Sequence, residues 1–225
     1  MIKEHSHDAF IKVPDDAILW QYMSLAKFIN LIRTKTLYLR RLDSFRDSKE
    51  GVLTTIDSNY FPMINIPLDY MERERKRIFV NCWIESPHEL ALMWETYGKG
   101  GVVIKTTAHR LRACMSSDQE HKLYLIKIRY IDPETDSCQD IGKELNALKI
   151  AVVKRKYYKQ EQEVRLLYST QEVQEDMKEI TIPLDTEVLI DKVIVYPNAE
   201  KYFLDTINSL LRENGISITA VNSEI

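Results

Sequence analysis

The chain of 225 residues is long enough for one domain with a substantial hydrophobic core or for two small domains. Hydrophobic residues make up 44% and charged residues 29% of it, an ordinary balance for a soluble globular protein. The formal net charge of -3 gives no global basicity of the kind that indicates a nucleic-acid-binding protein. With 6 glycines and 7 prolines, the composition also disfavours disorder and collagen-like repeats.

The three cysteines are widely spaced, and no CxxC or HxxxH pair accompanies them. We therefore expect no structural metal site. The first residues contain no apolar segment of the kind found in signal peptides. No apolar run approaches the roughly 18 residues that a membrane-spanning helix requires, so we expect a cytoplasmic protein with reduced thiols and no membrane partner.

The first half of the chain contains strands and helices at their typical spacings. Apolar residues recur at helical spacing after Ser24, which predicts a helix with a serine N-cap. The elements predicted in this half are strand 18–22, helix 25–33, strand 36–40, a charged loop 41–51, helix 68–77, strand 78–84, helix 88–97, strand 102–105 and helix 107–115.

The second half continues with a mixture of strands and helices. The predicted elements are strand 123–131, a long helix 139–157, strand 162–168, strands 177–183 and 188–196, helix 199–213 and strand 216–221. No linker composition interrupts the chain, so we predict a single α+β domain over 1–225 with a mixed, largely antiparallel sheet and flanking helices. A strand–helix–strand unit over 191–225 belongs to that domain.

Strand 162–168 and the residue before it carry three ionisable side chains. Because side chains alternate along a strand, Glu161, Glu163 and Arg165 fall on one face. They form either a solvated strand edge or a functional site. A carboxylate held on a strand can bind a ribose hydroxyl and stabilise positive charge on the adjacent sugar carbon, as breaking the glycosidic bond to nicotinamide requires.

Other residues have the chemistry to hold such a substrate. Aromatic rings can stack on a planar ring, and arginines can bind a diphosphate. The candidates are Trp20, Tyr22 and Tyr38 for stacking, and Arg40, Arg41 and Arg46 for the diphosphate. The alternative is that these aromatic residues belong to the core.

Two further functions are consistent with the residue pattern. Basic clusters at 73–77 and 154–159 fit a non-catalytic module that binds a nucleotide or nucleic acid. Asp47, Glu50 and Glu163 could instead surround a metal ion in a hydrolase or nuclease.

The order of motifs resembles a large, poorly characterised bacterial family. Its members share an opening aromatic strand, a Phe-x-Asp-Pro-x-Glu loop, a Met-Trp-x-x-Tyr segment, a Glu-x-Glu-x-Arg strand and a terminal strand–helix–strand. The matching segments here are 19–24, 45–51, 80–83, 92–97, 161–165 and the tail ending at 223–225.

That family in turn resembles the ADP-ribosyltransferase superfamily, especially its toxin and phage-defence branches. The resemblance implies an NAD-using mono-ADP-ribosyltransferase or NAD glycohydrolase that modifies a macromolecular acceptor, either protein or nucleic acid. It implies that Glu163 is catalytic, with Glu161 as its partner, and that Gln21 occupies the first-strand position of a histidine that contacts the NAD ribose. Gln21 in place of histidine, and Ser48 where proline is usual, depart from the family pattern.

Overall fold

The computed structural model describes residues 2–3, 10–45, 47, 50–51, 69–115, 122–136, 147–172 and 175–225. Within these ranges one sheet contains eleven strands. Its members are β1 (Ile2–Lys3), β2 (Ile11–Lys12), β3 (Ile18–Met23), β4 (Thr36–Arg41), β5 (Ile78–Glu85), β6 (Val102–Thr107), β7 (Leu123–Lys127), β10 (Glu163–Ser169), β11 (Glu179–Pro183), β12 (Lys192–Val195) and β13 (Val221–Asn222).

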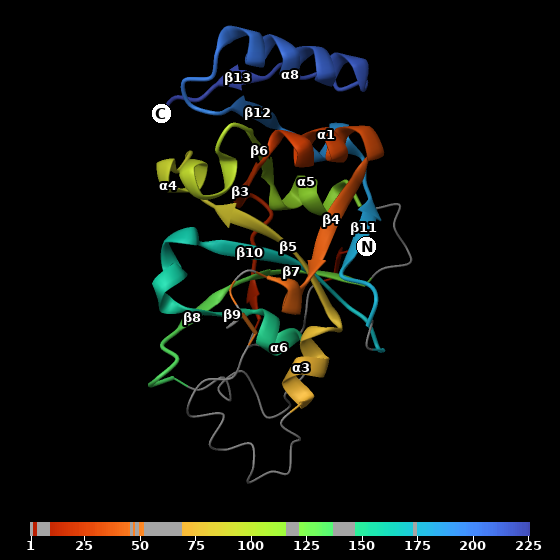
Figure 1. The fold of residues 1–225 in the computed structure, drawn as a ribbon, viewed down its shortest axis with the longest axis vertical. Helices are drawn as coiled ribbons and strands as arrows, with labels where there is room; N and C mark the ends of the chain where they lie inside the picture. Colours follow the sequence, from red (N-terminus) through yellow and green to blue (C-terminus); the bar gives the residue numbers. More distant parts are fainter. Residues whose placement is uncertain are drawn as a thin grey trace.

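The sheet runs in the order β1-β7-β10-β5-β3-β6-β12-β13, and β11-β4 joins it as a branch at β5 (Figure 1). Most neighbouring strands are antiparallel, but β1 with β7 and β12 with β13 are parallel. β5 divides the branches, because Trp20 of β3 pairs with Ile84 at one end and Arg40 of β4 pairs with Val80 at the other. The α+β class and the mixed, mainly antiparallel sheet predicted from the sequence are therefore confirmed.

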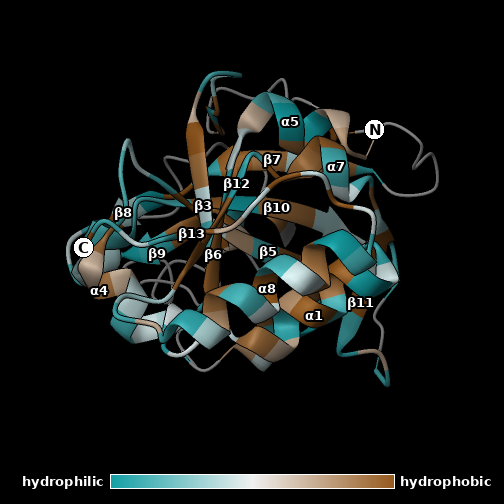
Figure 2. Ribbon diagram, turned by 90° about the horizontal axis from the view of Figure 1, so that it is seen from above, coloured by the Kyte–Doolittle hydropathy of each residue, from teal (hydrophilic) through white to brown (hydrophobic). Residues whose placement is uncertain are grey.

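Helices cover both faces of this sheet. One face carries α1 (Leu25–Thr34), α5 (Ala108–Ala113), α7 (Thr186–Leu189) and α8 (Lys201–Glu213), which contribute to the largest buried cluster. The other face carries η1 (Leu42–Ser44), α3 (Tyr70–Arg75), α4 (Ala91–Met93), the π-helical turn η3 (Trp94–Gly98) and α6 (Ala147–Ala151). Seen from above, the apolar strands lie between these layers, and α8 runs beside α1 with hydrophilic residues on its outer side (Figure 2).

Several predicted elements are present, although strand 188–196 is shortened to Lys192–Val195 after the helix α7, and strand 216–221 is found at Val221–Asn222. Helix α1 begins after Ser24, whose side chain accepts a hydrogen bond from the Lys27 amide, as the N-cap prediction required. The C-terminal unit forms β12, α8 and β13, with Ile194 paired to Val221, so it belongs to the main sheet. No helix in the described ranges combines the length and apolar character that crossing a bilayer requires.

Two helix predictions were wrong in ways that matter for the site. The predicted helix 88–97 is only the short α4, which continues into the wider turn η3. The predicted helix 139–157 is α6 where it is described, followed by β9 (Val153–Arg155), which pairs in parallel with β8 (Arg129–Ile131). The charged residues 156–161 then form the 3-10 helix η5 (Lys156–Glu161).

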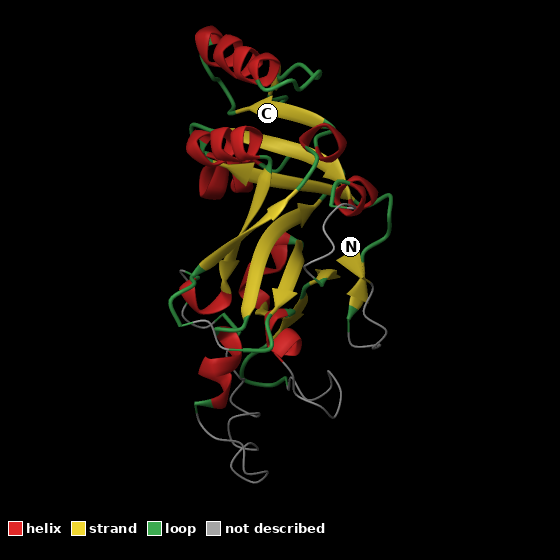
Figure 3. Ribbon diagram, turned by 90° about the vertical axis from the view of Figure 1, so that its right-hand side faces the viewer, coloured by secondary structure: helices red, strands yellow, loops and turns green. Residues whose placement is uncertain are grey.

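Figure 3 shows the helices, red, on both sides of the yellow sheet.

Gly101 lies where the backbone comes closest to a neighbouring strand. A Cβ on this residue would be 2.1 Å from the Met23 carbonyl oxygen, which the main chain fixes in place. We expect Gly101→Ala to lower the free energy of unfolding by about 3 kcal/mol, the upper part of the usual range for overpacking, because the backbone must shift to relieve the overlap. Urea unfolding measures this loss.

Gly100 is the matched control. It has a φ of 65°, and no atom lies within 4 Å of its added Cβ. Gly100→Ala therefore meets only the cost of a left-handed backbone, about 1 kcal/mol. Equal losses for the two variants would contradict the steric argument.

Candidate active site

The two predicted catalytic carboxylates lie on either side of a sharp backbone turn. Glu161 ends η5, and Glu163 begins β10. Gln162, between them, has left-handed backbone angles (φ 41°, ψ 49°). That conformation is unfavourable for a residue with a side chain, and such strained residues concentrate at functional sites.

Glu161 and Glu163 are joined by a single cation. Lys154 Nζ donates to Glu161 Oε2 at 2.6 Å and to Glu163 Oε2 at 2.8 Å. The prediction that Glu161, Glu163 and Arg165 share a strand face therefore holds for Glu163 and Arg165, whereas Glu161 precedes the strand and approaches Glu163 through Lys154. Lys154 is supplied by β9, a strand that sequence reasoning read as the end of a helix.

Arg165 binds the carboxylate of Glu163 from the interior of the protein. Its Nε donates to Glu163 Oε1 at 2.7 Å, and one terminal nitrogen donates to Glu50 Oε1 at 2.6 Å. The other terminal nitrogen donates to the Ala151 carbonyl oxygen at 2.7 Å. Arg165 is fully buried and Glu163 is 3% exposed, so the interpretation as a solvated strand edge does not apply.

Among the described residues, Lys154 and Arg165 together bind three carboxylates, those of Glu50, Glu161 and Glu163.

Neighbouring charges decide the protonation of this network. Burial alone would raise the pKa of Glu163, but Arg165 and Lys154 outweigh it and hold the pKa at about 2, so the carboxylate is ionised at neutral pH. Burial opposes the charge of Lys154, and Glu163 overcomes that effect and raises the pKa of the ammonium. Burial, followed by the negative charge of Glu163, raises the pKa of Cys82 well above its usual range, so Cys82 stays a neutral thiol.

Tyrosines surround the polar network. Tyr97 of η3 donates its hydroxyl hydrogen to Glu161 Oε1 at 3.0 Å. The Tyr130 hydroxyl accepts a hydrogen bond from the Glu163 amide at 2.8 Å. The ring of Tyr158 lies 4.8 Å from Lys154 Nζ, close enough for a cation–π contact.

The β3 candidates separate onto opposite faces of the sheet. Directly paired residues share a face, and Trp20 pairs with Ile84, which pairs with Glu163. Tyr22 therefore lies on the Glu163 face, where its hydroxyl accepts from the Leu90 amide at 2.8 Å. Gln21 points to the other face and donates to Asn81 Oδ1 at 2.8 Å, so the structure does not bring Gln21 together with Glu163.

The β4 candidates separate in the same way. Arg40 pairs with Val80, which places Arg40 and Tyr38 on the Glu163 face, and both are exposed. Tyr38 donates to Glu179 Oε2 at 2.8 Å. Arg41 is buried and donates to Asp43 and to the Glu175 and Met177 carbonyl oxygens, so its guanidinium is committed to the fold. Arg46 lies outside the described residues.

The basic clusters that suggested a nucleic-acid module are largely paired within the protein. In the first, Arg73 pairs with Asp69, Lys76 with Glu175 and Arg77 with Glu74. In the second, Lys154 lies in the carboxylate network, Arg155 pairs with Asp47 and Lys156 with Asp132. Within the described residues, these ion pairs offset most of the positive charge of the two clusters.

The proposed metal ligands are also separated by cations. The Arg165 guanidinium bridges Glu50 and Glu163, and Arg155 pairs with Asp47 at 2.8 Å. Among the described residues, no group of three His, Cys, Asp or Glu side chains has the arrangement of a metal site. The geometry of these three acids therefore gives no support to the metal-dependent hydrolase.

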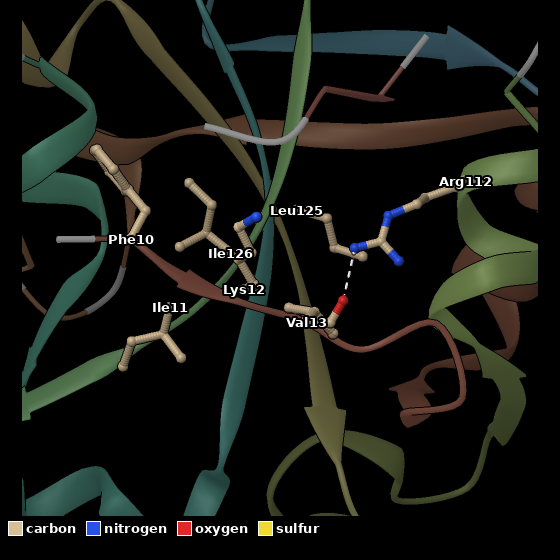
Figure 4. Close-up of a pocket in the computed structure, with 7 residues that line it drawn as sticks. All are labelled: Phe10, Ile11, Lys12, Val13, Arg112, Leu125 and Ile126. Atoms are coloured by element: carbon tan, nitrogen blue, oxygen red, sulfur yellow. Dashed lines mark hydrogen bonds between the residues drawn. The ribbon is translucent and has the colours of Figure 1, made fainter. Parts of the chain in front are cut away.

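Two cavities of the structure differ in their relation to the carboxylate network. A small cavity of about 10 Å³ is lined by Phe10, Ile11, Lys12, Val13, Arg112, Leu125 and Ile126 (Figure 4). It contains none of the candidate site residues, and its volume suits about one water molecule. An open depression of about 280 Å³ is lined by Asp16, Ile18, Glu85, Ser86, Pro87, Lys127 and Gln162, and Gln162 connects it to the carboxylate pair.

Sequence reasoning missed Lys154, Tyr97 and Tyr130 as members of the site. One signal could have found the lysine, because a carboxylate in an apolar strand requires a cation to offset its burial. No local pattern points to Tyr97 as a neighbour of Glu161, since 64 residues separate them.

Comparison with known proteins adds only distant structural likenesses. No family model matches the sequence, and no curated protein matches it. DarT from Thermus sp. 2.9 in complex with NAD+ superposes with a TM-score of 0.42 and 10% identity, over 94% of this chain and 96% of that chain. DarT from the same organism in complex with ADP-ribosylated ssDNA gives a TM-score of 0.42 and 10% identity, over 96% and 97% of the two chains. Likeness at this level assigns neither a fold family nor an activity to the chain.

Proposed function

We propose that this protein is an ADP-ribosyltransferase-like enzyme that uses NAD as a substrate and modifies a macromolecule, in the manner of a toxin or phage-defence effector. The observation that carries the proposal is the Glu161–Glu163 pair. Both carboxylates are buried and bridged by Lys154, Glu163 is ionised, and the exposed Tyr97 binds the outer oxygen of Glu161. The motifs at 92–97 and 161–165, which resemble those of the family, meet in this one site.

The chemistry follows from the charge. When the bond between the ribose and nicotinamide breaks, the electron pair leaves with nicotinamide and the sugar carbon becomes positive. An ionised Glu163 in a low-dielectric site stabilises that positive charge, and Arg165 and Lys154 keep the carboxylate ionised and oriented. A nucleophile on the acceptor, or water, then bonds to the sugar carbon and gives up its proton.

Two of the sequence-predicted binding residues are candidates for contact with the substrate. Tyr38 and Arg40 share the sheet face of Glu163 and are exposed, and Arg40 could contact a diphosphate. Tyr22 lies on the same face but is buried in an apolar cluster with Trp20 and Trp94, as the alternative of core aromatic residues expects. Gln21 and Arg41 are engaged within the fold and are weaker candidates. The depression beside Gln162 approaches the size of small-molecule pockets, about 300 Å³ and above.

Incubation with NAD labelled in the adenosine part tests the proposal. We expect nicotinamide release, and label transfer to a component of a bacterial lysate, with both lowered at least about 100-fold in Glu163→Gln because the transition-state charge loses its partner. Digestion of the labelled product with protease or nuclease identifies the acceptor as protein or nucleic acid.

Two controls separate chemistry from folding. Glu175→Gln removes an exposed carboxylate from the ion pair with Lys76 and should keep full activity. Glu161→Gln breaks fewer ion pairs than Glu163→Gln. If Glu163→Gln does not fold, Glu161→Gln replaces it as the test variant and should also have lowered activity. Saturable NAD binding without turnover, or equal activity in Glu163→Gln and the parent, would overturn the proposal.

A further inference from the structure

The carboxylate network runs from the surface to the interior. Tyr97 is 49% exposed, while the side chains of Glu161 and Lys154 are each 11% exposed. Glu163 is 3% exposed and Arg165 is fully buried. Exposure therefore decreases along the network from Tyr97 through Glu161 to Arg165.

Tyr97 is held at this position by an unusual turn. It lies in η3, a π-helical turn between Trp94 and Gly98, and such turns occur frequently at functional sites. The Trp94 ring meets Tyr22 edge to face, with centroids 5.1 Å apart, and Trp94 Nε1 donates to Glu89 Oε2 at 2.9 Å. A Cβ on Gly98 would lie 2.5 Å from the Trp94 ring, so the tight contact requires glycine there.

Glu161 depends on Tyr97 for the orientation of its outer oxygen. Lys154 holds Oε2, and the Tyr97 hydroxyl holds Oε1. The negative charge of Glu161 lies beside the hydroxyl, and it adds to burial in raising the pKa of Tyr97. The hydroxyl therefore stays protonated and remains a donor at neutral pH.

We propose that Tyr97 is a positioning residue. Its hydroxyl fixes the orientation of the Glu161 carboxylate at the more exposed end of the network. This inference rests on the proposed NAD chemistry for its effect on turnover. It assigns a role to a residue on η3, an element distant in sequence from the strand that bears Glu163.

Tyr97→Phe tests the role, because phenylalanine keeps the ring and removes only the hydroxyl. We expect kcat for NAD turnover to fall about tenfold with little change in KM, as loss of a hydrogen bond to a charged group predicts. When Glu161→Gln is already present, adding Tyr97→Phe should lower kcat little further, because the charged acceptor of the Tyr97 hydroxyl is already absent.

Tyr157→Phe is the matched control. Tyr157 is 60% exposed and lies outside the network, so its variant should match the parent in kcat and KM. A Tyr97→Phe enzyme with unchanged kcat would overturn the positioning role while leaving the proposed function intact.

A readout without activity separates the two proposals. Carbon-13 NMR of protein labelled at the tyrosine Cζ follows the ionisation of each hydroxyl. We expect one late-titrating signal to disappear in Tyr97→Phe and to titrate at lower pH in Glu161→Gln, since the nearby negative charge is removed. If the parent protein leaves NAD intact, the proposed function fails. The titration of the Tyr97 hydroxyl then decides separately whether Tyr97 contacts Glu161. Identical Tyr97 titrations in the parent and in Glu161→Gln would refute the positioning role.

Discussion

Glu163→Gln should lower the free energy of unfolding by about 3–5 kcal/mol, the range found when one partner of a buried ion pair is removed. The substitution keeps the size of the side chain but leaves Arg165 and Lys154 with a neutral amide. Both cations lose a carboxylate at hydrogen-bond distance, 2.7 Å for Arg165 Nε and 2.8 Å for Lys154 Nζ. Urea unfolding at neutral pH measures the difference.

The control is the same substitution in an exposed pair of equal length. Lys76 Nζ lies 2.7 Å from Glu175 Oε2, with side chains 31% and 66% exposed. Surface pairs contribute about 0–1 kcal/mol, so Glu175→Gln should be nearly neutral. Similar losses for Glu163→Gln and Glu175→Gln would show that burial of the first pair has no energetic consequence.

The stability contributed by Glu163 should disappear as the pH falls. Its pKa is lowered from 4.5 to about 2 in the folded protein, so the folded state favours the ionised form. The contribution is complete above about pH 5 and is lost as the pH falls through the folded pKa. The full shift corresponds to about 3 kcal/mol, of which about 2 kcal/mol is lost by about pH 3.

Urea unfolding from neutral pH to about pH 3 checks this expectation. Other carboxylates also titrate in that window, so the informative quantity is the difference between the parent and Glu163→Gln. We expect that difference to shrink by about 2 kcal/mol toward about pH 3, because protonation removes the charge that the variant already lacks. The difference between the parent and Glu175→Gln should stay small throughout. A difference for Glu163→Gln that is independent of pH would contradict the low pKa.

Local patterns in the sequence determined most of the elements. Strand β5, helix α1 with its Ser24 cap, and the C-terminal β12–α8–β13 unit follow from apolar periodicity and capping residues, which act within a few positions of the chain. The π-helical turn at Trp94–Gly98 was not predicted from local patterns, because its geometry depends on the packing of Trp94 against Tyr22. The strand β9 was missed for a similar reason, since its pairing partner β8 is distant in sequence.

The sequence by itself also determined that Glu163 and Arg165 lie on one face of β10, because alternation along a strand is a local property, whereas Glu161 joins them through the turn at Gln162 and the bridge of Lys154. Only the tertiary structure decided that the group is buried, that Lys154 bridges its carboxylates and that Glu50 and Tyr97 complete it. It also decided that Gln21 faces away from Glu163, through the register of β3, β5 and β10. The physical reason is that burial and charge pairing arise from contacts between distant segments, and these contacts set the pKa values on which the chemistry depends.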